Sequence, residues 1–358
     1  EFDAETFWNN KNIYRIGFVT EDDMKLVGRK EPSLMHNFLS GLQRSLSEIL
    51  DKHLEGENLG IAKALILGDK DELSSEARNS FSNAGAMHVL AVSGLHVGIV
   101  LYLLIFVLSR FSRYISKRTA LLIAILIIWI YAGMTGFSPS VLRASFMFTL
   151  LTLGQLSGKK VNSINILFFS AFVLLVFNPL LIYDIGFQLS YLAMIGIFTL
   201  YQPISRWFYV PNKWLRKIWE GTAVGIAAQT FTVPLSLFYF HQFPNYFALT
   251  NIGMMIFAGL VLGIGLFLFA IHWLRIISSI VGVLLAFAFS AMLFFIQFVE
   301  SIPGAVADGF TMTGTIVIAF YSTGLIVLLF NINKVVRNVS IGLLLVLFTF
   351  TQFTRHQN

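Results

Sequence analysis

Cysteine is absent from this sequence of 358 residues, which excludes a disulfide framework, thiol catalysis and any metal site built on cysteine. Charged side chains are also scarce. They make up 12% of the chain, whereas an average soluble domain has about 25%. Apolar residues take their place, with 56% hydrophobic residues and a mean hydropathy of +0.74. Long apolar runs are typical of spanning helices, so the predicted fold class is an all-α polytopic membrane protein.

We predict about ten transmembrane segments. Several apolar runs are shorter than the ~20 residues that a simple span requires, so we expect some short or broken helices. The predicted segments are 86–108, 119–134, 139–156, 162–178, 185–201, 220–240, 247–271, 276–299, 313–330 and 338–354.

The basic residues indicate an orientation. Residues 88–358 contain 15 Lys and Arg, and alternating spans place 13 of them on one side, most densely in loops 109–118 and 203–219. Basic residues favour cytoplasmic loops, so this side is predicted to be cytoplasmic and both chain ends external. Residues 1–87 carry 15 Asp and Glu against 10 Lys and Arg, which suits an external position. The net charge of +6 is therefore no sign of nucleic-acid binding by itself.

Three regions divide the chain. Residues 1–32 are polar, with a strand-like run at 13–19, and are predicted to be the tail of a preceding external β domain or a linker. Residues 33–83 are predicted to form external amphipathic interfacial helices, and residues 84–358 the transmembrane domain. The chain begins at Glu1 and has no signal peptide of its own, so we expect it to be part of a longer protein.

Residues 33–54 place apolar side chains such as Phe38 and Leu46 at helical spacing, with Ser33 as the predicted N-cap. This segment is too polar to span, so we predict a helix lying on the outer membrane surface. The alternative is an amphipathic helix packed on a soluble domain. A second short helix is expected at 59–67.

A carboxylate cluster follows, formed by Asp69, Asp71, Glu72 and Glu76. Clustered carboxylates bind divalent cations in nucleases. Acidic residues also favour the first turn of a helix, here one capped near Ser74. The second interpretation is preferred because no other ligand cluster accompanies the first.

Residues 84–100 combine an apolar sequence with several polar groups. Polar side chains in hydrocarbon are costly and usually face a protein interior or a water-filled path. If this stretch is one helix, His88 and His96 fall on one face, with Ser93 three residues before His96. Glycine pairs at GxxxG spacing, which allow close helix approach, occur here and in two later segments: Gly94/Gly98, Gly221/Gly225 and Gly259/Gly263.

Further polar residues concentrate in the spans between residues 88 and 251. Ser138 and Pro139 predict a helix start. Arg143 lies one turn further in, where a buried arginine requires a partner such as Asp184 or a wet cavity. This concentration predicts a polar path, whose candidate lining or DNA-contact residues are His88, Ser93, Gly94, His96, Arg143, Asp184, Gln188, Gln229 and Asn251.

Two alternative functions follow from the residues alone. Ser93 and His96 suggest an intramembrane hydrolase, although the Ala-Val-Ser-Gly-Leu context lacks a GxSxG elbow and no acidic residue lies nearby in sequence. Two histidines are too few ligands for zinc, so no catalytic residue, metal or cofactor is predicted. The other alternative is a small-solute transporter, for which an internal repeat would be typical.

Four sequence blocks follow one another over roughly residues 60–260. The first comprises Gly-Asp-Lys-Asp-Glu-Leu (68–73), Phe81 and His-Val-Leu-Ala-Val-Ser-Gly-Leu-His-Val (88–97). The second is Met-Thr-Gly-Phe-Ser-Pro-Ser-Val-Leu-Arg-Ala (134–144), and the third is Asn178-Pro179 with Asp-Ile-Gly-Phe-Gln-Leu-Ser (184–190). The fourth comprises Pro234-Leu235, Phe240-His-Gln242 and Asn251. In this order the blocks resemble those of the ComEC competence family.

The resemblance implies a transmembrane competence domain that carries single-stranded DNA across the bacterial plasma (inner) membrane during natural transformation. It also implies the lipid bilayer, an external DNA receptor and cytoplasmic motor or strand-binding proteins as partners, and leaves the oligomeric state open. Many members carry an external β domain and a metallo-β-lactamase-like domain. Here most of the first and all of the second are missing, with no metal motif of that kind, so we expect this chain not to be an enzyme.

Overall fold

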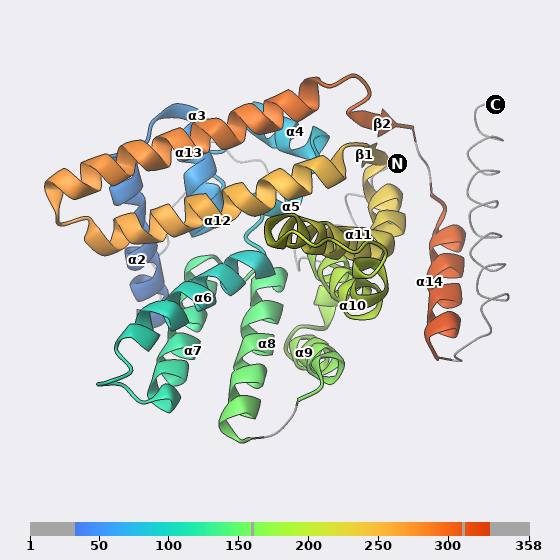
Figure 1. The fold of residues 1–358 in the computed structure, drawn as a ribbon, viewed down its shortest axis with the longest axis horizontal. Helices are drawn as coiled ribbons and strands as arrows, with labels where there is room; N and C mark the ends of the chain where they lie inside the picture. The colour runs from blue at the N-terminus through green and yellow to red at the C-terminus, as the bar shows by residue number, and fades with distance from the viewer. Residues whose placement is uncertain (1–32, 159–160, 310–311, 330–358) are drawn as a thin grey trace, which may run out of the picture. The chain divides into compact units, whose positions relative to one another are not determined.

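The computed structural model describes residues 33–158, 161–309 and 312–329. This part of the chain is almost entirely helical, and its two short strands pair with each other (Figure 1). The predicted all-α polytopic membrane fold is confirmed. Among the described residues, five helices are long and apolar enough to cross a membrane: α7 (Lys117–Met134), α10 (Ile185–Ser205), α11 (Lys213–Phe240), α12 (Phe247–Ile271) and α13 (Arg275–Ser301).

The other elements complete the described chain. Those before α7 are α2 (Leu34–Asp51), α3 (Gly56–Ala62), the π-helix η2 (Lys63–Leu67), α4 (Ser75–Asn83), α5 (Met87–Leu90) and α6 (Gly94–Arg110). Those after it are α8 (Pro139–Leu156), α9 (Ser163–Phe177), the 3-10 helix η3 (Pro179–Tyr183), β1 (Gln242–Pro244), β2 (Val306–Asp308) and α14 (Gly314–Leu329).

The predicted apolar segments coincide in order with the helices from α6 to α14. The last predicted segment, 338–354, and the predicted β tail, 1–32, lie outside the described residues. The helix starts also follow the sequence. Ser33 and Ser74 accept hydrogen bonds from the backbone N–H groups three residues on, at 3.2 Å and 3.0 Å, and α8 begins with Ser138 as N-cap before Pro139.

The chain folds into two compact units that alternate along the sequence. Of the residues that the structure describes, unit 1 comprises 33–73, 91–158, 161–191 and 259–289. Unit 2 comprises the described residues 74–90, 192–258, 290–309 and 312–329.

In unit 1, α2 packs against the C-terminal end of α7. A β-carbon on Gly133 would lie 2.7 Å from Cδ1 of Leu39, so the glycine allows the two helices to meet closely. Gly68, which has a φ of 76°, packs in the same way against Thr135 just after α7. Segment 34–73 therefore lies at the end of α7 that the charge pattern predicts to be external.

The second short helix predicted at 59–67 belongs to the core of unit 1. Here α3 continues directly into η2, and every residue from Gly60 to Leu67 is buried. Gly60 lies against the backbone carbonyl of Glu72, which only a residue without a side chain permits. Residues 60–67 are therefore not available for contact with lipid. The interfacial position of α2 stays a prediction.

In unit 2, glycines bring α10, α11 and α12 together. Gly196 of α10 lies against the backbone carbonyl of Ala227 in α11. The Gly221/Gly225 pair packs on α12, where a β-carbon on Gly225 would lie 3.4 Å from Nδ2 of Asn251. Strands β1 and β2 pair antiparallel in the same unit.

Candidate functional site

Residues 84–100 do not form one helix, because the chain is broken between α5 and α6. Ser93 is the N-cap of α6 and has an extended backbone. Its Oγ lies 2.9 Å from Nδ1 of His96, and its backbone N–H donates to the same nitrogen at 3.2 Å. This reciprocal contact satisfies free polar groups and stabilises a new helix start. The condition under which His88 and His96 would share one helix face, a single helix over residues 84–100, is therefore not met.

The side chain of His96 is fully buried. Its contact with Ser93 indicates which nitrogen of the imidazole carries the proton. Because Nδ1 accepts a backbone N–H, the neutral imidazole carries its proton on Nε2. The hydroxyl–imidazole distance of 2.9 Å is in addition one that a nucleophile and its general base require. The same geometry therefore serves a helix cap and is compatible with a serine nucleophile.

The start of α6 meets α8 at Arg143. A β-carbon on Gly94 would lie 2.9 Å from Nη2 of Arg143 and 3.5 Å from Cβ of Ala144, so a larger residue at position 94 requires the guanidinium to move. One turn later, a β-carbon on Gly98 would lie at an ordinary contact distance of 3.7 Å from Cζ of Phe148. The Gly94/Gly98 pair thus packs on α8, with the tighter fit at position 94.

Arg143 is 7% exposed and makes its main contacts with α10. Its Nη1 donates to the backbone carbonyl of Ser190, and its guanidinium carbon lies 5.9 Å from the centroid of the Tyr191 ring. A carbonyl acceptor and an aromatic face both stabilise a buried guanidinium. The first, second and third sequence blocks therefore converge on this side chain within unit 1.

The pair of Arg143 with Asp184, considered as an alternative role of the arginine, is not formed. Among the described residues these two make no ion pair with each other. Asp184 instead accepts the backbone N–H of Phe187 at 2.8 Å, and Gln188 donates to the carbonyl of Ile182 at 2.7 Å. Asp184 therefore stabilises the start of α10, where an unpaired N–H otherwise costs free energy, and Gln188 satisfies a carbonyl of the preceding η3.

Several buried polar atoms of unit 1 have no hydrogen-bond partner within the described part of the chain. An unpaired buried polar atom lowers the stability of the fold by about 1–3 kcal/mol, and water or a polar ligand usually supplies the missing hydrogen bond. Such atoms are expected beside a polar path through apolar surroundings. They are Arg143 Nε, Ser138 Oγ and Ser145 Oγ near or on α8, Ser190 Oγ on α10, and Tyr131 OH on α7.

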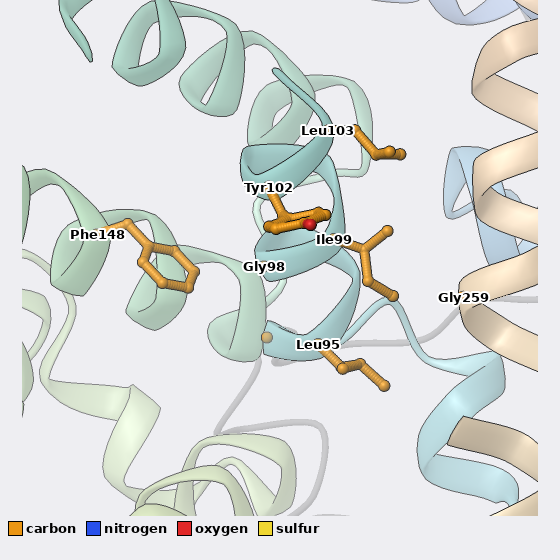
Figure 2. Close-up of a pocket in the computed structure, with 8 residues that line it drawn as sticks. Leu95, Gly98, Ile99, Tyr102, Leu103, Phe148 and Gly259 are labelled. Atoms are coloured by element: carbon orange, nitrogen blue, oxygen red, sulfur yellow. The ribbon is translucent and has the colours of Figure 1, made fainter. Parts of the chain in front are cut away.

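A hollow of about 560 Å³ lies beside α6 (Figure 2). Its wall is largely apolar and includes two aromatic rings, those of Tyr102 and Phe148. Gly259 and Gly263 of α12, predicted to be a helix-packing pair, make no close packing contact, since a β-carbon on either glycine would meet nothing within 4 Å. The lining residues are Gly94, Leu95, Gly98, Ile99, Tyr102, Leu103, Phe148 and Gly259.

The remaining path candidates belong to unit 2. His88 is exposed on α5. Gln229 is half-buried in α11 and accepts from Oγ1 of Thr232 at 3.3 Å. Asn251 faces Gly225 between α11 and α12. Their polar groups thus lie on helices of one unit, where Asn251 has a packing role.

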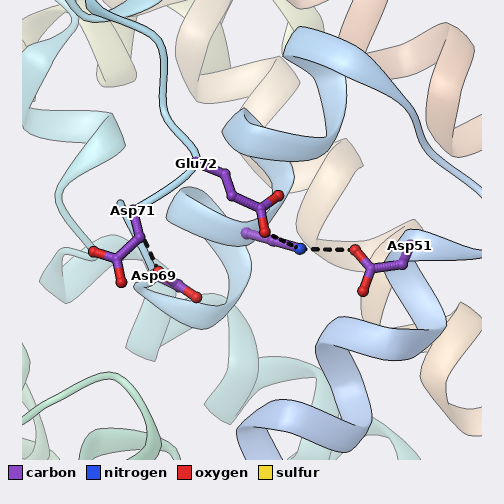
Figure 3. Close-up of polar contacts among 5 residues, drawn as sticks. Asp51, Asp69, Asp71 and Glu72 are labelled. Carbon is purple, nitrogen blue, oxygen red and sulfur yellow. Dashed lines mark hydrogen bonds and ion pairs between the residues drawn. The ribbon is translucent and has the colours of Figure 1, made fainter.

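One member of the carboxylate cluster, Glu72, pairs with Lys63, and so does Asp51 of α2 (Figure 3). Nζ of Lys63 lies 2.6 Å from Oε1 of Glu72 and 2.7 Å from Oδ1 of Asp51. Asp69 accepts the backbone N–H of Asp71 at 3.1 Å. Within the ranges that the structure describes, no group of three His, Cys, Asp or Glu could hold a metal ion. Most of the cluster therefore serves local structure.

Two details of this cluster differ from the sequence prediction. Of the four acids, only Glu76 occupies the first turn of α4. Lys63 was missed, although a single charge inside the apolar run 61–67 could have indicated a buried ion pair. Burial alone would lower the pKa of Lys63, but the hydrogen bonds to Asp51 and Glu72 outweigh this effect and raise the pKa above its ordinary value of 10.5. Tyr191 was also missed, one residue beyond the third block.

Comparison with known proteins supports the family that the four blocks resemble. The family model described as "Competence protein" matches residues 65–334. This range includes all of the candidate path residues.

Curated relatives match over part of their length. ComE operon protein 3 of Bacillus subtilis is 30% identical over 216 residues, which cover 60% of this chain and 26% of the relative. Recombination protein 2 of Haemophilus influenzae is 24% identical over 254 residues, 67% of this chain and 30% of that protein. An uncharacterized protein of Aquifex aeolicus is 30% identical over 202 residues, 55% of this chain and 46% of that protein. The chain thus spans between about a quarter and a half of the length of these relatives. No solved structure matches the chain.

Proposed function

The chain belongs to the competence protein family, and on this premise we propose that it forms the membrane part of a DNA-uptake protein that conducts single-stranded DNA across the plasma membrane. The observation that carries this proposal is the convergence of three sequence blocks on Arg143. Burial of an arginine in a membrane segment costs free energy, so such a residue is usually retained for a function.

The chemistry around Arg143 suits weak contact with a phosphate backbone. A path that conducts a strand must compensate about one charge per nucleotide without holding any of them firmly. One guanidinium with an unpaired Nε, accompanied by serine hydroxyls without partners in the described chain, offers few and weak contacts. A groove with many arginines would bind more tightly and would be strongly salt-dependent.

The hollow beside α6 supplies the second property that a strand requires. Aromatic side chains bind single-stranded nucleic acid without sequence preference because every base has a face that stacks. Tyr102 and Phe148 provide such rings next to Gly94 and Gly98. The hollow is therefore proposed as a contact for bases, and Arg143 as a contact for phosphates.

The remaining parts of the proposal concern the surroundings of this domain. We place it in the bacterial inner membrane, with an external DNA receptor on the N-terminal side and a cytoplasmic motor or strand-binding protein opposite. The chain itself is proposed to be no enzyme, so degradation of the second strand belongs to another segment or another protein.

Substitution of Arg143 tests the proposed path. Arg143→Gln removes the charge and should lower the uptake of labelled DNA while the protein stays at normal abundance in the membrane. Arg113→Gln is the matched control, because Arg113 is exposed and lies outside the helices. Internalised single-stranded label and membrane abundance are measured for both variants in naturally transformable cells.

The outcomes separate the possible roles of Arg143. If uptake and abundance fall in proportion, Arg143 has only a structural role. Normal uptake at normal abundance removes Arg143 from the path. Because Asp184 and Arg143 are not paired, Asp184→Asn combined with Arg143→Gln should show no recovery. Normal transformation in a strain that lacks the whole protein contradicts the DNA-channel function itself.

A hydrolase remains the second candidate function because of one observation, the contact of Ser93 Oγ with Nδ1 of His96 at 2.9 Å. A covalent mechanism requires a reactive serine, and a cap requires only a hydroxyl. Reaction of the intact protein with a serine-directed fluorophosphonate distinguishes these cases.

A further inference from the structure

The two ends of α2 have different surroundings. At the C-terminal end Ile49 and Leu50 are buried, at 8% and 0% exposed. At the N-terminal end Leu34, Met35 and Phe38 are 89%, 66% and 55% exposed. Large apolar side chains grouped in this way lose free energy in water, so the exposed end requires an apolar environment.

The contacts of α2 determine where this end lies. Leu39 packs on Gly133 near the C-terminal end of α7, which is one of the helices able to cross a membrane. Gln43 donates to the carbonyl of Leu67 at 3.2 Å. Asp51, the last residue of α2, pairs with the buried Lys63. The helix is therefore held against the end of α7, a candidate span, and its exposed apolar residues lie near that end.

We propose that the first two turns of α2 insert into the lipid–water interface of the bilayer and anchor this segment through Leu34, Met35 and Phe38. Interfacial helices typically bury their apolar face about 5–10 Å into the boundary between headgroups and acyl chains. The occupant of this surface is the bilayer because α7, the element on which α2 is docked, already provides the adjoining membrane-facing surface.

The charges of α2 indicate how the anchor binds. Residues 34–41 contain no Lys, Arg, Asp or Glu, and the rest of the helix contains Arg44, Glu48 and Asp51. Electrostatic attraction to anionic lipid requires clustered basic residues, which α2 lacks. Insertion should therefore depend on apolar burial and occur in zwitterionic lipid. The inference does not rest on transport of DNA.

The absence of cysteine allows a direct test with single fluorescent labels. Phe38→Cys carries the environment-sensitive dye NBD, and His36→Cys is the matched control. These residues are two positions apart on α2 and lie on nearly opposite sides of the helix. Leu34→Cys is a second probe, which tolerates labelling because the side chain is 89% exposed. Each intact protein is placed in phosphatidylcholine nanodiscs and must elute like the wild type.

Lipid insertion predicts opposite quenching at the two faces. Dyes at positions 38 and 34 should be quenched by a nitroxide lipid and protected from iodide, at a depth of about 5–10 Å. The dye at position 36 should be quenched by iodide. Added salt should leave the lipid quenching unchanged. Iodide quenching at positions 38 and 34, or protection from both quenchers because a second copy or residues 1–32 cover the face, overturns the proposal, and so does loss of lipid quenching in salt.

Discussion

Gly94 and Arg143 face each other so closely that a β-carbon on the glycine would lie 2.9 Å from Nη2 of the arginine. The small residue and the large side chain fit together. The glycine leaves space for a guanidinium at the start of α6, and the guanidinium is held in that space by the backbone carbonyl of Ser190. Two sequence blocks that are far apart along the chain therefore depend on one packing contact.

This contact predicts different effects for two glycines of the same helix. Gly94→Ala should lower the free energy of unfolding by about 1–3 kcal/mol, because Arg143 must move. Gly98→Ala, at an ordinary 3.7 Å from Phe148, should be neutral or stabilise by about 0.5–1 kcal/mol, because alanine favours a helix over glycine. Gly94→Leu should abolish function.

Chemical unfolding in detergent measures both alanine variants, and DNA uptake tests Gly94→Leu. Gly94→Ala combined with Arg143→Gln should lose less than the sum of the single changes, because the shorter side chain relieves the crowding. Equal effects of the two alanine substitutions would exclude this account.

The network of Lys63, Asp51 and Glu72 predicts that removing the charge of the two carboxylates costs more stability than removing the ammonium of the lysine. Asp51→Asn with Glu72→Gln leaves the ammonium of a 5%-exposed side chain without partners, and should cost about 3–5 kcal/mol. Lys63→Met returns two carboxylates, 44% and 53% exposed, to water, and should cost about 1 kcal/mol or less. The triple variant should recover most of the loss, as measured by thermal unfolding in detergent. A large loss in Lys63→Met alone would contradict this order.

The raised pKa of Lys63 predicts a dependence on alkaline pH. A lysine whose pKa is higher in the folded than in the unfolded state contributes stability that is complete below its unfolded pKa, and that is lost as the pH rises through the folded pKa. The contribution of Lys63 should therefore be constant up to about pH 10.5 and decrease above it, with a slope of up to about 1.4 kcal/mol per pH unit. Lys63→Met is the reference, because it cannot titrate. A constant difference in unfolding free energy across this range would refute the shift.

Ser93 is predicted to act as a helix cap and not as a nucleophile. Ser93→Ala should retain most DNA uptake, because a small residue suffices for packing, and should lower the free energy of unfolding by about 1 kcal/mol through loss of the cap. Ser93→Thr, which keeps the hydroxyl, is the control for capping. Labelling of Ser93 by a fluorophosphonate would favour the hydrolase instead.

The topology is predicted from the basic loops, with 109–118 and 203–219 cytoplasmic and residues 1–87 external. An impermeant thiol reagent added to intact cells should label Ser33→Cys and leave Arg113→Cys unlabelled until the membrane is opened. The background is clean because the chain has no cysteine. Labelling of Arg113→Cys in intact cells would reverse the orientation.

Local chemistry in the sequence determined the helical character of this protein and many of its helix ends. Long apolar runs require helices in a bilayer. Ser33 and Ser74 start helices because each accepts a backbone N–H within one turn of itself, and Pro139 suits the first position of α8 because its φ is already close to the helical value. The four blocks likewise indicated the family from residues in fixed order. None of these conclusions requires knowledge of a distant contact.

Tertiary structure decided which residues meet. Helical spacing placed His88 and His96 on one face, but a cap between Ser93 and His96 begins a new helix there, since satisfying free backbone groups outweighs continuity. Charge suggested Asp184 as the partner of Arg143, yet the carboxylate caps α10 and the guanidinium takes a backbone carbonyl and an aromatic ring. A sequence lists donors and acceptors, but which of them are within reach depends on how closely the helices pack, and in unit 1 that distance is controlled by glycines such as Gly94 and Gly133.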